Sequence, residues 1–195
     1  VTGHVWNDAN SNETQDGTEA GTNAGSSTLT VYVVDSSGNI VDKATVAADG
    51  SYTLSNVPVN SGLTLRLSND SSVAVGSSAP AVSLPTGWVN TGENLDGTPE
   101  ATTPGEIAIT TTTTAVANQN FGVEQLPVTT AVTAPVMPNT NGDTALAPLA
   151  GTDADGTITE FTIVTIPPAS QGVLKWDDDN DASTPPVAVA AGQTI

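Results

Sequence analysis

The sequence predicts an all-β protein, and three observations support this fold class. Val, Thr, Ala and Ser dominate the chain, and Gly and Pro interrupt it at short intervals. Several short segments alternate apolar and polar side chains, which is the period of a half-buried strand. No stretch has a convincing helical period. β-Branched residues between Gly and Pro breakers are typical of short strands joined by turns.

In residues 1–126 we expect a series of strands separated by turns. Alternation predicts them at Val1–Trp6, Ser27–Asp35, Ile40–Ala48, Ser51–Val57, Leu63–Leu67, Glu106–Asn118 and Gln119–Glu124. Asp49-Gly50 is a strong two-residue hairpin signal. The threonine run inside Glu106–Asn118 has apolar residues on both sides, which favours a strand over a low-complexity linker. The Ser-, Gly- and Pro-rich stretch from Leu67 to about Pro104 predicts loops.

Residues 127–195 predict a second, shorter β-unit. Residues 126–139 hold three prolines, which indicates a stiff connector that can also supply a first strand. Further strands are expected at Thr157–Ile166, Gly172–Trp176 and Val187–Ala191, with turns at Asp153–Gly156 and Asp177–Asp181. The unit is short for a β-sandwich. We therefore expect it to be incomplete and completed by further sequence or by a neighbouring chain.

The charge balance restricts the partners. The chain has 21 acidic and three basic side chains, with a formal net charge of -18. Such a charge repels nucleic acid and anionic membrane surfaces, so we expect neither as a partner, and it attracts divalent cations. Cysteine is absent, which excludes disulfides and thiolate metal sites. Bound metal is then the expected alternative source of stability for a protein with a small core.

One loop has its chemistry specified residue by residue. Oxygen-bearing side chains stand at positions 1, 3, 5, 9 and 12 of a twelve-residue stretch, and a backbone carbonyl is available at position 7. These residues are Asp8, Asn10, Asn12, Asp16 and Glu19, with Thr14 supplying the carbonyl. This is the ligand spacing of a calcium loop of the EF-hand kind. Magnesium is a poorer fit, because it demands near-octahedral geometry and retains its water.

The loop departs from the usual pattern at position 6, where Glu13 replaces the glycine that makes the sharp turn. A side chain disfavours positive φ, so this departure affects the turn and removes no ligand. The flanking segments are strand-like, so the loop does not lie between two helices. We therefore expect calcium to rigidify the protein and not to act as a switch.

Residues 1–125 resemble the SdrD B-like repeat domains of bacterial surface proteins, relatives of the collagen-adhesin B-type fold. The resemblance depends on GHVWNDANSNETQDGTE, on DGSYTLSNVP at Asp49–Pro58 and on NQNFGV at Asn118–Val123. It implies a prealbumin-like or immunoglobulin-like β-sandwich, calcium held in loops, and an extracellular location in a cell-surface stalk. By position, the six ligands named above become the main calcium site.

Residues 127–195 resemble a cadherin-like tandem repeat of bacterial adhesins, through GTDADGTITEF, PPASQGVLKW and VAVAAGQTI. The two resemblances together imply two tandem immunoglobulin-like or prealbumin-like β-sandwich units, the second of them incomplete. In such repeats, acidic turns can bind calcium. The resemblance makes Asp153 and Asp155 candidate ligands, with a second set at Asp177, Asp179 and Asp181. Exposed acidic turns without a metal are an equally good interpretation of both sets.

The residues argue against an enzyme. His4 is the only histidine, and it lies in an alternating segment beside Trp6, where a packed or half-exposed side chain is the commoner outcome. Zinc sites of hydrolases usually need several His or Cys ligands. Trp6 and Trp176 end strand segments, which predicts core or half-buried packing. Trp88 lies in a loop-rich region and is the best candidate for a contact surface.

Three functions fit these features. The first is a calcium-stiffened structural spacer of a secreted bacterial adhesin or stalk, with neighbouring repeats as partners. The second is a subunit of an extracellular filament, in which a neighbour supplies the missing strand by β-strand addition. The third is an adhesive module that binds a surface glycan or a host protein through Trp88.

Overall fold

The structure is a computed structural model that describes residues 1–95, 98–100, 103–133, 142–177 and 185–195, without the side chains of residues 94–100. These residues form strands and irregular segments and no helix, so the all-β class is confirmed. No helix among them could cross a membrane. The chain divides into two compact units. The first comprises Val1–Leu126 with Ala154–Gly156, and the second comprises Pro127–Asp153 with Thr157–Ile195.

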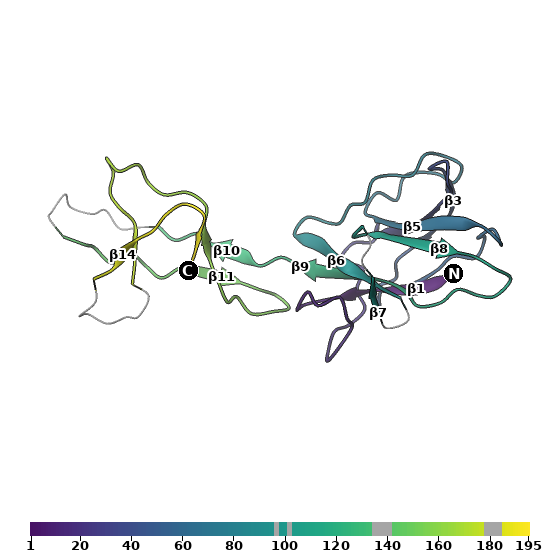
Figure 1. Ribbon diagram of the computed structural model, residues 1–195, viewed down its shortest axis with the longest axis horizontal. Helices are drawn as coiled ribbons and strands as arrows, with labels where there is room; N and C mark the ends of the chain where they lie inside the picture. Colours follow the sequence, from purple (N-terminus) through teal and green to yellow (C-terminus); the bar gives the residue numbers. More distant parts are fainter. Residues whose placement is uncertain (96–97, 101–102, 134–141, 178–184) are drawn as a thin grey trace. The chain divides into compact units, whose positions relative to one another are not determined.

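The first unit contains a five-stranded sheet in the order β4-β1-β9-β6-β7 (Figure 1). Its strands are β1 (Thr2–Asn7), β4 (Ser51–Thr53), β6 (Trp88–Leu95), β7 (Thr98–Glu100) and β9 (Gln119–Gln125). β1 and β9 pair in parallel, whereas the other pairs are antiparallel. β9 pairs with the last three residues of β1, Val5–Asn7, and the candidate calcium loop begins directly after them.

The second sheet of the first unit has four antiparallel strands in the order β3-β2-β5-β8. These are β2 (Thr30–Val34), β3 (Ile40–Thr45), β5 (Gly62–Ser68) and β8 (Glu106–Thr110). The two sheets form separate layers in Figure 1. This arrangement is consistent with a β-sandwich.

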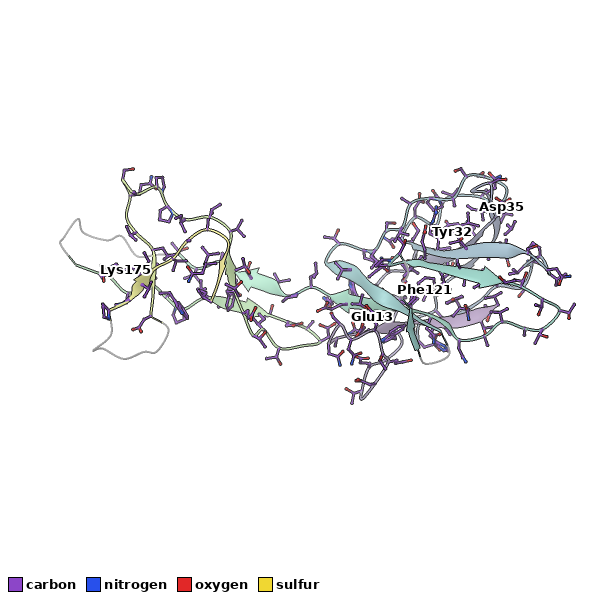
Figure 2. The ribbon with its side chains drawn as sticks, viewed as in Figure 1. Glu13, Tyr32, Asp35, Phe121 and Lys175 are labelled. Atoms are coloured by element: carbon purple, nitrogen blue, oxygen red, sulfur yellow. The ribbon has the colours of Figure 1, made fainter. Side chains whose placement is uncertain are left out.

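The main core lies between the two sheets. Alternate apolar side chains of both sheets share one buried cluster, which includes Val5, Val31, Leu65, Ile107, Phe121 and Val123. Tyr52 adds an aromatic contact, with its ring centroid 6.3 Å from that of Phe121. Tyr32 alternates with the core residues of β2 and belongs instead to a smaller cluster with Val34 and Ile40 (Figure 2). The second cluster therefore lies on the opposite face of the four-stranded sheet.

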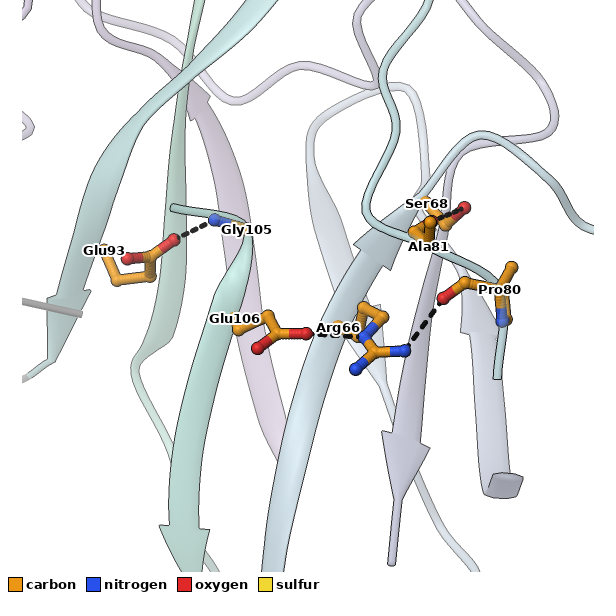
Figure 3. A network of polar contacts seen from close by, with 7 residues as sticks. All are labelled: Arg66, Ser68, Pro80, Ala81, Glu93, Gly105 and Glu106. Atoms are coloured by element: carbon orange, nitrogen blue, oxygen red, sulfur yellow. Dashed lines mark hydrogen bonds and ion pairs between the residues drawn. The ribbon is translucent and has the colours of Figure 1, made fainter. Parts of the chain in front are cut away.

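A strap, defined as residues 69–83, covers this opposite face. Val73 and Ala79 of the strap pack against the Tyr32 cluster. The only two basic side chains of residues 1–126 hold the strap. Lys43 Nζ donates to the carbonyls of Ser71 and Val73 at 2.9 and 2.7 Å. Arg66 Nη1 donates to Pro80 O at 3.0 Å, and its Nε pairs with a Glu106 oxygen at 2.7 Å (Figure 3).

Two predictions about local structure were wrong. Asp49-Gly50 does form a turn, with Gly50 at a φ of 80°, but β3 and β4 belong to different sheets and do not form a hairpin. Only Thr110 of the threonine run belongs to a strand, because β5 begins at its partner Gly62 and the ladder stops there. The N–H of Thr111 still donates to Ser61 O at 2.9 Å. Thr111 Oγ1 donates to Pro58 O at 2.6 Å.

β6 lies in the stretch where loops were expected. Asn90 and Gly92, which look like turn residues in the sequence, flank a register shift in its pairing with β9. A bulge accommodates such residues within a strand. Trp88 begins β6, is partly buried and packs against the main core. Its position therefore gives the glycan-binding alternative no support.

The second unit consists of three two-stranded sheets, β10-β11, β12-β15 and β13-β14. The strands are β10 (Val128–Thr130), β11 (Ala150–Thr152), β12 (Thr162–Ile163), β13 (Lys175–Trp176), β14 (Val187–Ala188) and β15 (Gln193–Thr194). β12, β13 and β14 are shorter than the segments predicted for them, and β11 and β15 lie where no strand was predicted. Among the described residues of this unit, Val189 is the only buried hydrophobic side chain. Trp176 is 39% exposed, so it is not a core residue.

Candidate calcium site

The candidate calcium loop, Asp8–Glu19, begins directly after β1 and contains turns and bends but no strand. The N–H of Asp8 donates to Val123 O of β9 at 2.8 Å, and the N–H of Asn7 donates to Ala20 O at 2.9 Å. Both ends of the loop are thus tied to the five-stranded sheet. The strand setting predicted for this loop is confirmed.

Asp8 organises the first half of the loop. Its side chain is fully buried. Its two carboxylate oxygens accept hydrogen bonds from two successive backbone N–H groups, those of Asn12 and Glu13, each at 3.0 Å. A buried carboxylate needs such compensation, because burial of a charge without partners is strongly unfavourable. Asp8 therefore closes the turn, and each of its oxygens keeps a lone pair for a further contact.

The other predicted ligands also participate in the hydrogen bonding of the loop. Asn10 Oδ1 accepts from the N–H of Asn12 at 3.1 Å, and Asn12 Oδ1 accepts from the N–H of Thr14 at 2.9 Å. Asn12 Nδ2 donates to Asp16 Oδ2 at 3.0 Å. Amide and carboxylate oxygens have more than one lone pair, so an oxygen that accepts an N–H can also bind a cation.

Glu19 closes the loop and leaves one oxygen unsatisfied. Its Oε2 accepts from the N–H of Asp16 at 3.1 Å. Its Oε1 is buried and has no hydrogen-bond partner among the described residues. A buried carboxylate oxygen without a donor is costly unless a ligand satisfies it. At position 12, where a calcium loop has its bidentate carboxylate, this oxygen fits a bound cation.

The backbone of the loop turns sharply where the spacing predicts. Glu13, at position 6, has a φ of 61°, which lies in the left-handed region that favours glycine. Ser11 and Gly17 have φ values of 54° and 52°. The glycine position of a calcium loop thus keeps its expected conformation although a glutamate occupies it.

The donors as a group are suited to a hard cation. Among the described residues, no three Asp, Glu, His or Cys side chains gather closely enough to hold a metal by themselves. The predicted set, however, includes two amides and a backbone carbonyl besides its three carboxylates. Oxygen donors of this mixed kind are typical of Ca²⁺ sites. The candidate is therefore the whole loop and not an acidic cluster.

The weaker candidates occupy different positions. Asp155 belongs to the first unit, and its Oδ2 accepts from Asn7 Nδ2 at 2.7 Å. Asp153 belongs to the second unit. Asp177 is exposed directly after β13. Asp179 and Asp181 lie outside the described residues.

In two further acidic turns the carboxylate accepts hydrogen bonds from a serine two residues later. The Asp49 carboxylate accepts hydrogen bonds from the Ser51 hydroxyl and N–H, which lower its pKa. Asp70 has the same arrangement with Ser72, whose hydroxyl and N–H lower the pKa of that carboxyl. These carboxylates stabilise turns in the way expected of exposed acidic residues. His4, the only histidine, is exposed on β1.

The sequence did not predict the part of the sheet that contacts the loop, which we call the seat and define by Trp6, Gly92 and Gly122. Trp6 of β1, Gly122 of β9 and Gly92 of β6 form one row across three paired strands. Trp6 is fully buried, as predicted, but on the face opposite the main core, because Val5 points into that core. Its Nε1 is buried without a partner among the described residues. The sequence could not predict that Gly92 and Gly122 lie beside Trp6, because the neighbours of a residue across the sheet depend on strand register.

No family model matches this chain, and no curated protein matches it either.

Proposed function

We propose that this chain is a calcium-stiffened structural module of a secreted bacterial cell-surface protein. The proposal takes the first unit as an immunoglobulin-like or prealbumin-like sandwich, as the resemblance to SdrD B-like repeats implies. Its role is to hold neighbouring parts of a stalk or adhesin in a defined, rigid arrangement. No catalysis is part of the proposal.

The observation that carries the proposal is the unsatisfied Glu19 Oε1 at the end of a loop whose other oxygens follow calcium-ligand spacing. Asp8, Asn10, Asn12, Asp16, Glu19 and the Thr14 carbonyl would hold the ion. Calcium would supply positive charge to the three carboxylates of the loop. The loop begins directly after β1, and Ala20, the residue after its last ligand, accepts a hydrogen bond from the N–H of Asn7 in β1. A bound ion would therefore fix residues 8–19 against the sheet.

Thermal unfolding of the full chain tests this proposal. Ligands that bind only the folded state raise its stability by mass action. We expect a melting temperature that rises by several degrees when excess calcium replaces a chelator, and by less with magnesium. The Glu19→Gln variant should lose most of this difference. A wild-type transition that is the same in calcium and in chelator would contradict the proposal.

A second candidate, a filament subunit completed by β-strand addition, has one observation in its favour. Nine large hydrophobic side chains of the described second unit are exposed. They are Val128, Val132, Leu146, Leu149, Val164, Ile166, Val173, Trp176 and Val187. A strand from a neighbouring copy would pair with exposed sheet edges and cover such side chains.

The oligomeric state separates the two candidates. Electron microscopy of concentrated protein, with light scattering across a concentration series, should show filaments with a regular repeat if strand addition operates. Val164→Lys and Val187→Lys should then abolish assembly, because a charge placed against an apolar strand opposes its docking. A spacer module gives no lattice and remains monomeric in both measurements.

A further inference from the structure

We propose that Glu13 is a positioning residue for the cation, anchored on a seat that Gly92 leaves open. This inference rests on the proposed calcium function and extends it to a residue outside the ligand set. Glu13 stands where calcium loops usually have glycine, and it has the left-handed backbone of that position. A glutamate there is conformationally disfavoured relative to glycine. A contact made by its side chain can offset this cost.

That contact is with β6. A Cβ added to Gly92 would lie 2.6 Å from Glu13 Cγ and 2.7 Å from Glu13 Cδ. The Glu13 side chain thus occupies the space directly above the Gly92 backbone, and an added Cβ at this position would force that side chain to shift. Figure 2 shows the position of Glu13 in the first unit.

The seat is built into the sheet. Gly92 is the register partner of Gly122, which is the register partner of Trp6. A Cβ on Gly122 would lie 2.9 Å from Trp6 Cζ2 and 2.5 Å from Thr91 Oγ1. The two glycines therefore form a shallow surface on which the Trp6 ring and the Glu13 side chain both rest. The bulge between Asn90 and Gly92 sets the place of this surface along β6.

The backbone connects the seat to the cation site. Glu13 N–H donates to Asp8 Oδ2 at 3.0 Å, so the placement of Glu13 fixes the orientation of the first predicted ligand. The Glu13 side chain packs on the Gly92 backbone, and the Glu13 N–H donates to the Asp8 carboxylate. The Asp8 oxygens would then bind the ion. Groups that orient a metal ligand commonly change metal affinity when they are removed, by about 10- to 100-fold.

The test measures calcium affinity of the full chain by calorimetry in five variants besides wild type. Glu13→Gly, Glu13→Ala and Gly92→Ala should each weaken calcium binding, by about tenfold. In the Glu13→Ala background, Gly92→Ala should cost less than about twofold further, because the clashing side chain is gone. Gly62→Ala is the matched control: Gly62 also lies in a strand, at β5, and an added Cβ meets nothing within 4 Å.

The outcomes separate this inference from the function on which it rests. Wild-type protein that does not bind calcium would overturn the proposed function. Wild-type binding that persists unchanged in Glu13→Gly and Gly92→Ala would overturn the positioning role alone. Tighter binding by Glu13→Gly would also overturn it, since relief of backbone strain would then outweigh the anchor. Urea unfolding in chelator gives a second readout: Gly92→Ala should lower the midpoint when Glu13 is present and not when it is alanine.

Discussion

Asp8 and Glu13 are joined by a hydrogen bond from the Glu13 N–H to Asp8 Oδ2 at 3.0 Å. The other Asp8 oxygen accepts from the N–H of Asn12 at the same distance. One buried carboxylate thus satisfies two successive donors of the turn. This arrangement makes Asp8 both the first predicted ligand and the group that shapes the loop.

Asp8→Asn should therefore weaken both folding and cation binding. An amide nitrogen cannot accept, so the N–H of Asn12 or of Glu13 loses its bond to the side chain at position 8, at a cost of about 1–3 kcal/mol of unfolding free energy in chelator. Calcium affinity should fall by about tenfold or more with the loss of a charged ligand. Chemical denaturation in chelator and calorimetry with calcium measure the two effects.

Asp35→Asn is the control for this substitution. Asp35 also accepts two backbone N–H groups, from Ser37 and Asn39, but both reach the same oxygen, Oδ1, at 2.9 Å. An asparagine oxygen can accept both bonds, so stability and calcium affinity should change little. If the two variants behave alike, the role assigned to the paired Asp8 oxygens is wrong.

Trp6 should report on the order of the loop. Its ring is fully buried on the face that carries the loop, and the bridge from Trp6 to Gly21 ties the segment after the loop to β1. In a protein with Trp88→Phe and Trp176→Phe, chelation should shift the emission to longer wavelength as water reaches the ring. Emission that stays the same in calcium and chelator would show that the loop does not depend on the ion.

The strap gives a prediction that is independent of calcium. Lys43→Met removes two charge-assisted hydrogen bonds to strap carbonyls and should lower the unfolding free energy by about 2 kcal/mol. Lys175→Met is the comparison, because Lys175 pairs with the exposed Asp143 at 2.9 Å. An exposed pair contributes about 0–1 kcal/mol. Equal effects in urea denaturation would contradict the role of Lys43.

Alkaline pH should destabilise the first unit through Tyr52. Burial raises the pKa of the Tyr52 hydroxyl well above its ordinary value, and the hydroxyl donates to Gln119 O. The unfolded chain ionises near pH 10 and the folded chain does not, so stability is complete below pH 10 and falls as pH rises further. Each buried tyrosine contributes a slope of up to about 1.4 kcal/mol per pH unit.

Tyr52→Phe should be less stable than wild type at neutral pH and should show a shallower loss of stability above pH 10. Urea midpoints measured across this pH range provide the check. A slope that Tyr52→Phe leaves unchanged would mean that other groups cause the alkaline unfolding.

Alternation predicted several strands of the first unit, including β2 and β5. Val31, Val33, Leu63, Leu65 and Leu67 alternate in this way, and they form β2 and β5 in the main core. The sequence did not predict which strands pair with each other. Asp49-Gly50 forms a tight turn in either arrangement, and only tertiary packing sends β3 and β4 to different sheets.

For the candidate site, the spacing of oxygen side chains predicted a loop between strands, and the structure places Asp8–Glu19 there. The seat could not be predicted, because the neighbours of Gly92 and Gly122 depend on the register of β1, β9 and β6. The second unit was the least predictable. Its alternating segments do not find a shared core among the described residues, so hydrophobic pattern alone overestimated the length of its strands.

The most direct test of the central claim is a calcium titration of the metal-free full chain by isothermal calorimetry, with magnesium and Glu19→Gln in parallel. The account predicts saturable calcium binding that is tighter than magnesium binding, and an affinity at least about tenfold weaker in Glu19→Gln, which loses a carboxylate ligand. Absence of saturable calcium binding, or binding of equal affinity in wild type and Glu19→Gln, would contradict it.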